Sequence, residues 1–191
     1  SEDKLRASLT LDEVKRLADT PCESDVLRRA SFFSILTGLR HIDIKNLKWK
    51  QISQTSNGSW RIDISQIKTK VGAYLPISDQ AYAMCGTRPE DEELLVFAGL
   101  QNAAWISKPL KKWIEAAGIK KHITFHLSRH SYATLQLELG TDIYTIKSML
   151  GHTNVKTTQI YSHIVDSAKE QAANTIHTVL YTHLRTQKTP D

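Results

Sequence analysis

The 191-residue sequence has only two cysteines, Cys22 and Cys85, and they lie far apart in the chain. Two isolated cysteines provide neither a disulfide framework nor the paired thiolates of a structural zinc site. No apolar run approaches the roughly 20 residues that span a bilayer, and no stretch has the features of a secretory signal peptide. These absences predict a soluble protein of the reducing cytoplasm, with no membrane partner.

Two common catalytic signatures are missing as well. No glycine-rich loop precedes a Lys-Ser or Lys-Thr pair, so the sequence lacks the phosphate-binding loop of many nucleotide hydrolases. Acidic residues are not paired at metal-ligand spacing, which leaves a two-metal nuclease without its ligands. The sequence therefore predicts neither a nucleotide cofactor nor a catalytic metal.

The composition is that of a globular and moderately basic chain. Apolar residues make up 40% and charged residues 24%, which supplies enough apolar material for a core and too little charge for a disordered polyelectrolyte. The formal net charge is +5. Because an excess of Lys and Arg attracts phosphate over long distances, this charge favours a polyanionic partner without deciding the matter.

Helix signals dominate the first part of the chain. Thr10 and Glu13 have the spacing of a capping box, which predicts the start of a helix, and Pro21 should end it. Thr37-Gly38 should end the next helix, because glycine readily adopts the left-handed conformation. Helices are thus predicted over residues 11–20, 25–36 and 42–47.

A short β region separates these helices from the rest of the chain. Strands are expected at 49–52, 60–64 and 73–77, and Asn57-Gly58 between the first two is a strong hairpin signal. Further helices are predicted over 79–84, 102–117, 125–139, 142–150, 154–160 and 167–184. The core is expected to contain the four tryptophans, Trp49, Trp60, Trp105 and Trp113. The fold class is therefore mainly α with a small antiparallel three-stranded β-sheet (α+β).

The segment 126–161 contains the residues with the most chemical information. His126 and Arg129 are three apart on a predicted helix, so their side chains share one face. Arginine presents a planar fork of donors that can bind a phosphate at two points. His152 follows a glycine at a helix end, and Tyr161 follows a short helix.

This order of residues resembles a known family. His-x-x-Arg, then Leu-Gly-His, then Thr-x-x-Tyr within 124–164 resemble the signature of the tyrosine recombinase, or phage integrase, family. The upstream segment 36–43 resembles the family's first-arginine motif and contains Arg40. Lys68, eight residues before Pro76, resembles the family's hairpin lysine. Matching positions in the right order on the right elements are specific, and the resemblance covers residues 9–165.

The resemblance implies a catalytic set of Arg40, Lys68, His126, Arg129, His152 and Tyr161. Tyr161 would attack a DNA phosphodiester to give a 3′-phosphotyrosine and a free 5′-hydroxyl. Arg40 and Arg129 would neutralise the non-bridging oxygens in the transition state. Because these cations replace a metal and the covalent link stores the bond energy, the resemblance implies no cofactor, no metal and no ATP.

The remaining roles come from the same resemblance. Lys68 would be the general acid for the departing 5′-oxygen, and Lys70 competes for this role because a hairpin can shift register. His126 would accept or relay the tyrosine proton, and His152 would hydrogen-bond the phosphate. Asp43 departs from the family pattern, since the acid that supports the first arginine is more often the longer glutamate.

The resemblance also implies a domain organisation and partners. Residues 1–165 would form the catalytic domain and residues 166–191 a C-terminal helical tail, while the family's N-terminal core-binding domain is expected to precede Ser1 and to be absent from this chain. The implied partners are double-stranded DNA and further copies of the chain in a tetrameric synapse, with a DNA-bending accessory protein as an optional addition. In a bacterium the protein would then associate with the nucleoid.

The tail has a single apolar stripe. Its members recur at steps of three and four residues on an otherwise polar segment: Ala168, Ala172, Ile176, Val179, Leu180 and Leu184. Such a stripe has to be buried, because in water it would form a sizeable exposed patch. Folding back on its own domain in cis and docking on a neighbouring subunit in trans are equally compatible with the sequence.

Two other function classes fit parts of the chain. The segment 142–161 has a helix, a glycine turn and a helix, which would suit a non-enzymatic helix-turn-helix DNA-binding regulator. That hypothesis gives no reason for His126, Arg129 and Tyr161 to occur together. A type IB topoisomerase-like DNA-relaxing enzyme would share the chemistry, but the short form and the Leu-Gly-His motif favour an integrase. His126 and His130 also have metal-pair spacing, yet no third ligand is in register.

Overall fold

The computed structural model describes residues 8–64, 74–142 and 145–146, without the side chains of residues 127 and 128. The elements follow the chain in the order α2 (Leu11–Asp19), α3 (Asp25–Thr37), α4 (His41–Lys45), the 3₁₀ helix η1 (Trp49–Gln51), β1 (Ile52–Gln54), β2 (Trp60–Asp63), β3 (Tyr74–Ile77), α5 (Asp79–Met84), α6 (Ala103–Ala116) and α7 (Phe125–Glu138). The predicted class, mainly α with a small antiparallel three-stranded sheet, is confirmed.

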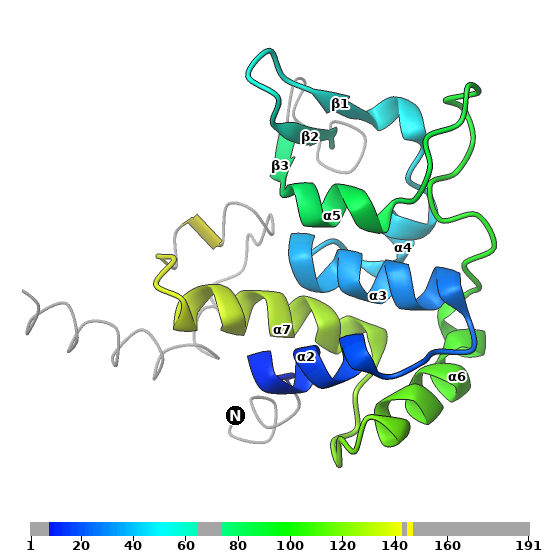
Figure 1. Cartoon of the computed structure of the whole chain (residues 1–191), viewed down its shortest axis with the longest axis vertical. Helices are drawn as coiled ribbons and strands as arrows, with labels where there is room; N and C mark the ends of the chain where they lie inside the picture. The colour runs from blue at the N-terminus through cyan, green and yellow to red at the C-terminus, as the bar shows by residue number, and fades with distance from the viewer. Residues whose placement is uncertain (1–7, 65–73, 143–144, 147–191) are drawn as a thin grey trace, which may run out of the picture.

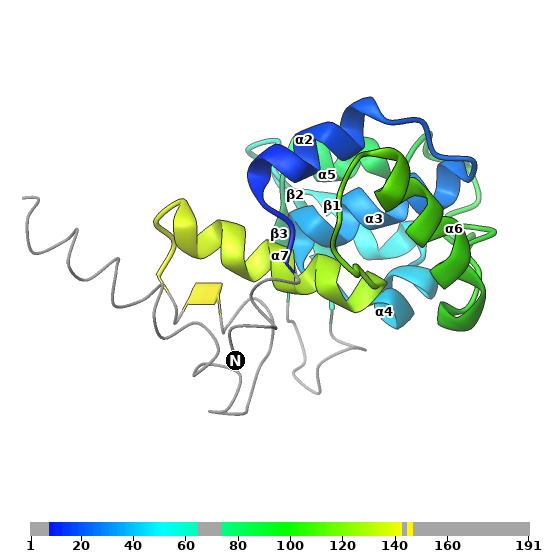
Figure 2. The ribbon, with the colours of Figure 1, turned by 90° about the horizontal axis from the view of Figure 1, so that it is seen from below.

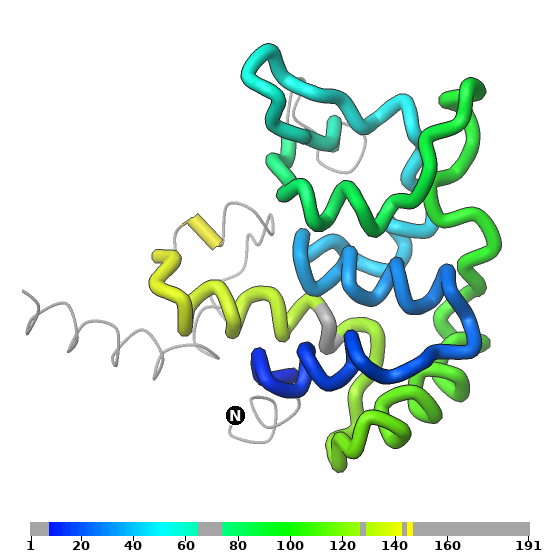
Figure 3. The backbone as a smooth tube through the Cα atoms, viewed as in Figure 1, coloured from blue at the N-terminus to red at the C-terminus, as the bar shows by residue number. Residues whose placement is uncertain are grey.

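Helix α3 lies at the centre of the molecule. Figure 1 shows α5 on one side of it and α2 and α7 on the other, with the sheet beyond α5. Its buried side chains include the consecutive residues Phe32, Phe33, Ser34 and Ile35, which point to different faces of the helix. A helix that is apolar around much of its circumference has to be covered on several sides, and this explains its central position. In Figure 3 the chain can be followed from α5 through the long loop 85–102 to α6.

The start of α2 has the predicted capping box. The Thr10 hydroxyl accepts a hydrogen bond from the Glu13 amide at 3.1 Å, and the Glu13 carboxylate accepts one from the Thr10 amide at 2.9 Å. Lys121, from the segment before α7, donates to the same carboxylate at 2.6 Å. The local cap is therefore also a tertiary anchor that ties α2 to the chain just before α7.

The sheet is a meander in the order β1-β2-β3. Gly58 has a φ of +88°, a conformation that suits glycine, so the predicted Asn57-Gly58 turn is confirmed. Ile62 pairs with Ile52 on one side and with Leu75 on the other, and these three buried side chains form the inner face of the sheet.

Two expectations about tryptophans are wrong. Trp49 lies in η1 instead of a strand, because the Gln51 side chain accepts from the Lys48 amide and closes a helical turn there. Trp105 is 72% exposed, whereas Trp49 and Trp113 are buried as expected. Trp113 lies on the face of α6 that packs on the core, with Ile106 and Leu110, and Trp105 lies outside that face.

The described residues contain no helix that is both long and apolar enough to cross a membrane.

Candidate active site

The turn that presents Arg40 is built by α3 itself. Gly38 ends the helix with a φ of 75°, as predicted, and its amide donates to the Ser34 carbonyl at 2.8 Å. The buried Ser34 hydroxyl donates to the Leu39 carbonyl at 2.9 Å, and the Leu39 amide donates to the Thr37 hydroxyl at 3.2 Å. These side chains replace the hydrogen bonds that are missing at the helix end, so the backbone just before Arg40 is held in one conformation.

Arg40 is held by Asp43 from the first turn of α4. The Arg40 Nε donates to Asp43 Oδ2 at 2.8 Å, and its Nη2 is 3.4 Å from Oδ1, so the contact is bidentate. The shorter aspartate can take the place of the family's more usual glutamate, because residues three apart on a helix lie on one face and Asp43 is already close to the Arg40 guanidinium. The Asp43 side chain is only 11% exposed, whereas that of Arg40 is 52% exposed. The ion pair therefore orients a guanidinium that still faces solvent.

His126 lies in the first turn of α7, one turn before His130. The two rings meet edge to face, with centroids 5.3 Å apart. Partial burial of the imidazole and, to a smaller extent, the positive charge of Arg129 lower the pKa of His126 below its ordinary value of 6.5. Although the residue remains exposed, its ring is therefore neutral near pH 7 and can accept a proton.

The starts of α4 and α7 meet at His41. Its ring lies edge to face against Phe125, with centroids 5.2 Å apart, and its Nε2 donates to the Gln101 carbonyl at 2.9 Å. His41 directly follows Arg40, and Phe125 directly precedes His126. Figure 2 shows α4 beside the N-terminal end of α7. The structure thus brings the segments that contain Arg40, His126 and Arg129 to one place, although they are distant in the sequence.

Half of the predicted catalytic set lies outside the described residues: Lys68, with its competitor Lys70, His152 and Tyr161. The same is true of the tail 166–191 and of nearly all of the predicted helices over 142–160. Within the described part of the chain, no group of three or more His, Cys, Asp and Glu residues is arranged to hold a metal ion.

Sequence reasoning did not single out His41. The available signal was an aromatic side chain next to each of two site residues, namely His41 beside Arg40 and Phe125 beside His126. Such a signal is weak, because the sequence does not show that the two rings meet.

A helical domain with this small sheet, an oriented arginine at the start of α4 and a His-x-x-Arg turn at the start of α7 is of the tyrosine recombinase catalytic-domain class. The model of the phage integrase family matches residues 7–168. The chain belongs to this family.

Individual relatives agree with this assignment. The chain is 32% identical over 181 residues to a tyrosine recombinase of Thermosipho africanus, and the match covers 88% of this chain and 61% of the relative. It is 33% identical over 183 residues to the tyrosine recombinase XerA of Pyrococcus furiosus, with the same two coverages, 88% and 61%. The chain therefore spans about three fifths of the length of these relatives.

Solved structures show the same fold. A XerA recombinase superimposes with a TM-score of 0.66 at 26% identity, over 90% of this chain and 63% of the other. The catalytic domain of bacteriophage HP1 integrase superimposes with a TM-score of 0.62 at 22% identity, over 88% of this chain and 94% of the other. The HP1 comparison, with its low identity, concerns the fold alone.

Proposed function

We propose that this chain is the catalytic domain of a site-specific DNA recombinase that cleaves and rejoins strands through a 3′-phosphotyrosine intermediate. The observation that carries the proposal is the meeting of the starts of α4 and α7, where an oriented, solvent-facing Arg40 lies near the His126–Arg129 turn. Two cations brought to one place, Arg40 and Arg129, are what a doubly charged phosphorane-like transition state requires.

In the proposed mechanism the Tyr161 oxygen attacks the phosphorus, and the bond from phosphorus to the 5′-oxygen breaks. The neutral His126 ring accepts the tyrosine proton, directly or by relay, and Lys68 donates a proton to the departing 5′-oxygen. Arg40 and Arg129 stabilise the charge on the non-bridging oxygens. The steps run in reverse when a 5′-hydroxyl attacks the phosphotyrosine, so the new phosphodiester forms without ATP.

His152 completes the proposed set as a hydrogen-bond donor to the phosphate. Lys70 remains the alternative to Lys68 as the general acid. The two lysines are distinguished by cleavage of a substrate with a 5′-bridging sulfur, since a thiolate leaves without protonation. That substrate should restore cleavage to whichever lysine variant, Lys68→Ala or Lys70→Ala, has lost its general acid.

The proposed partner is double-stranded DNA. A XerH recombinase has been solved bound to its difH substrate, and a λ integrase fragment as a dimer on a core site. The resemblance to the family implies in addition that copies of this protein would assemble on DNA as a tetrameric synapse, aided in some contexts by a DNA-bending accessory protein, and would be found with the nucleoid. The catalytic domain would comprise residues 1–165, preceded in the whole protein by a core-binding domain.

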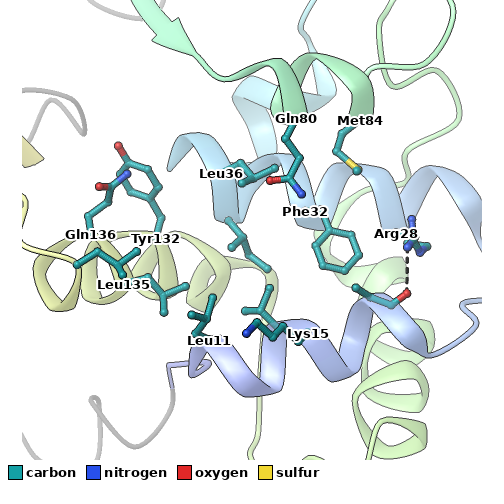
Figure 4. Close-up of a pocket in the computed structure, with 14 residues that line it drawn as sticks. Leu11, Lys15, Arg28, Phe32, Leu36, Gln80, Met84, Tyr132, Leu135 and Gln136 are labelled. Atoms are coloured by element: carbon teal, nitrogen blue, oxygen red, sulfur yellow. Dashed lines mark hydrogen bonds between the residues drawn. The ribbon is translucent and has the colours of Figure 1, made fainter.

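The tail 166–191 has a suitable acceptor surface in the described part of the chain. A groove of about 390 Å³ runs between α2, α3, α5 and α7. Figure 4 shows its apolar lining and the basic side chains at its rim: Leu11, Phe32, Leu36, Met84, Leu135, Lys15 and Arg28. The apolar stripe around Ile176 and Leu180 needs such a surface. The tail of a neighbouring copy is the proposed occupant, which would couple assembly to cleavage.

This docking proposal is tested with one variant on each side. Leu11→Asp places a charge at the groove, where Leu11 is already 44% exposed, and Ile176→Asp with Leu180→Asp alters the tail. Both should impair cooperative assembly on DNA, and their combination should add little. Leu94→Asp, at a position 50% exposed and away from the groove, is the control. Loss of near-UV dichroism in the tail variant would indicate docking in cis, and unaltered assembly would refute the proposal.

The proposed activity is tested with a nicked suicide DNA substrate that traps the covalent intermediate. The wild-type chain should form an SDS-stable adduct with DNA, and Tyr161→Phe should form none while it still binds the same DNA. Tyr74→Phe is a matched control, because its ring remains under the Arg61 guanidinium, 4.0 Å away. An adduct from Tyr161→Phe, or none from the wild type, would overturn the proposal and favour a DNA-binding regulator.

A further inference from the structure

His41 makes two contacts that converge on the proposed active site from different elements. Its Nε2 is 2.9 Å from the carbonyl oxygen of Gln101, in the residue pair that precedes α6. A carbonyl oxygen only accepts hydrogen bonds, so Nε2 must be the protonated nitrogen and must donate. The second contact of His41 is the edge-to-face contact of its ring with Phe125, the first residue of α7. We call the place where these contacts meet the junction.

The helices that meet here lack a side-chain N-cap hydrogen bond at their starts. Among the described elements, the N-cap residues of α4, α6 and α7 are Arg40, Asn102 and Thr124, and none of them forms a side-chain capping bond. By contrast, α2, α3 and α5 each have a capping side chain at their start. The relative positions of the three uncapped starts therefore depend on tertiary contacts.

His41 supplies such a contact to all three. It belongs to α4, donates to the segment that enters α6 and packs against the first residue of α7. Lys45, one turn later on α4, adds a second tie, because its Nζ donates to the Leu100 carbonyl at 2.8 Å. The neighbours of His41 and Phe125 in the chain are Arg40 and His126, so a shift at this junction would move both.

We propose that His41 is a positioning residue that sets the distance between the Arg40 guanidinium and the His126–Arg129 turn. This inference rests on the proposed function of the same site. His41 does not touch the phosphate in this proposal; it acts through the backbone of Arg40 and through Phe125. A misplacement of about 1 Å between catalytic groups lowers a rate by up to about 100-fold, so the effect should be on the chemical step and not on DNA affinity.

Three variants separate the two contacts. His41→Gln retains a side-chain NH group at about the reach of Nε2 but loses the ring, His41→Phe retains the ring but loses the donor, and His41→Ala loses both. Single-turnover cleavage of the suicide substrate is measured at saturating protein, and the dissociation constant by fluorescence anisotropy. His122→Ala, at an exposed histidine outside the site, is the matched control.

We expect His41→Ala to cleave on the order of 10- to 100-fold more slowly with an unchanged dissociation constant. His41→Gln and His41→Phe should each recover part of the rate, and His122→Ala should match the wild type. If His41→Ala fails to fold, as judged by near-UV dichroism, the Gln and Phe variants provide the same comparison.

Folded His41 variants that all cleave at the wild-type rate would overturn the inference, as would variants that lose DNA affinity in proportion to rate. Failure of the proposed function gives a different result, because the wild-type chain itself would then form no adduct.

Discussion

The Glu13–Lys121 pair and the Arg40–Asp43 pair each contain a carboxylate in the first turn of a helix, but their surroundings differ. The Glu13 side chain is 9% exposed and that of Lys121 29%, and the carboxylate also accepts from the Thr10 amide. In the second pair the carboxylate is buried to a similar degree, yet the arginine is 52% exposed. The first pair joins two distant segments of the chain, the start of α2 and the segment before α7, whereas the second orients a cation towards solvent. The same chemistry thus serves stability in one place and presentation of charge in the other.

The largest expected effect separates the two pairs by function. Arg40→Ala should slow cleavage of the suicide substrate by about 100-fold or more, because a preorganised charge that meets the transition state is lost. Its effect on the free energy of unfolding should be smaller than that of losing the Lys121 cation, since the Arg40 side chain is 52% exposed and water screens its charge. Single-turnover rates and urea unfolding measure the two quantities. If Arg40→Ala were strongly destabilised but cleaved DNA normally, the Arg40–Asp43 pair would serve stability instead of catalysis.

The buried pair should respond in the opposite way. Lys121→Met removes the hydrogen-bonded cation of the Glu13 carboxylate and leaves only Arg16, whose Nη2 is 3.9 Å from Glu13 Oε2. The free energy of unfolding should fall by about 1–3 kcal/mol. Urea unfolding at neutral pH measures this loss, and the folded fraction should cleave DNA at the wild-type rate. Lys120→Met, at the exposed neighbouring position, is the control and should have little effect. Equal stability of the two variants would show that the Glu13–Lys121 contact adds nothing.

The Glu13 anchor also predicts a pH dependence. Burial alone would raise the pKa of the Glu13 carboxyl, but hydrogen bonds from Lys121 and Thr10 outweigh it and hold the pKa below its ordinary value of 4.5. The folded state then binds fewer protons than the unfolded state. This part of the stability is complete above pH 4.5 and is lost as the pH falls through the folded pKa.

Glu13→Gln provides the test of that pH dependence. The difference in unfolding free energy between wild type and variant should narrow as the pH falls below 4.5. A difference that stays constant over the acid range would show that the carboxyl has an ordinary pKa in the folded protein.

The smallest expected effect concerns the proton acceptor of the proposed site. An NMR titration of the His126 ring should give a pKa below 6.5, so its neutral form should persist to lower pH than in an unfolded chain. Because partial burial is the larger cause and the Arg129 charge the smaller, Arg129→Gln should return only a minor part of the shift. Complete return to 6.5 in that variant would make the charge the dominant cause.

Local signals explain which parts of the fold could be predicted. The Thr10–Glu13 capping box, the left-handed Gly38 and the Asn57-Gly58 turn all involve residues within a few positions of each other, and all are confirmed. The burial of Trp105 was predicted wrongly because it depends on distant partners, and Trp49 was buried as expected but placed in a strand instead of η1. Arg88 Nη2 donates a hydrogen bond to the Trp49 carbonyl at 3.1 Å, and no local sequence pattern predicts this contact.

By itself the sequence determined the family, because the order and spacing of the motif residues are visible without a structure. It also determined the ends of several helices, since capping and glycine effects are local. Arg40, His126 and Arg129 could be named in this way. Only the tertiary structure decided that the starts of α4, α6 and α7 meet at His41, and that α2, α3, α5 and α7 enclose an apolar groove. Such contacts join residues far apart in the chain, and they form only because the packing of the whole core brings those residues together.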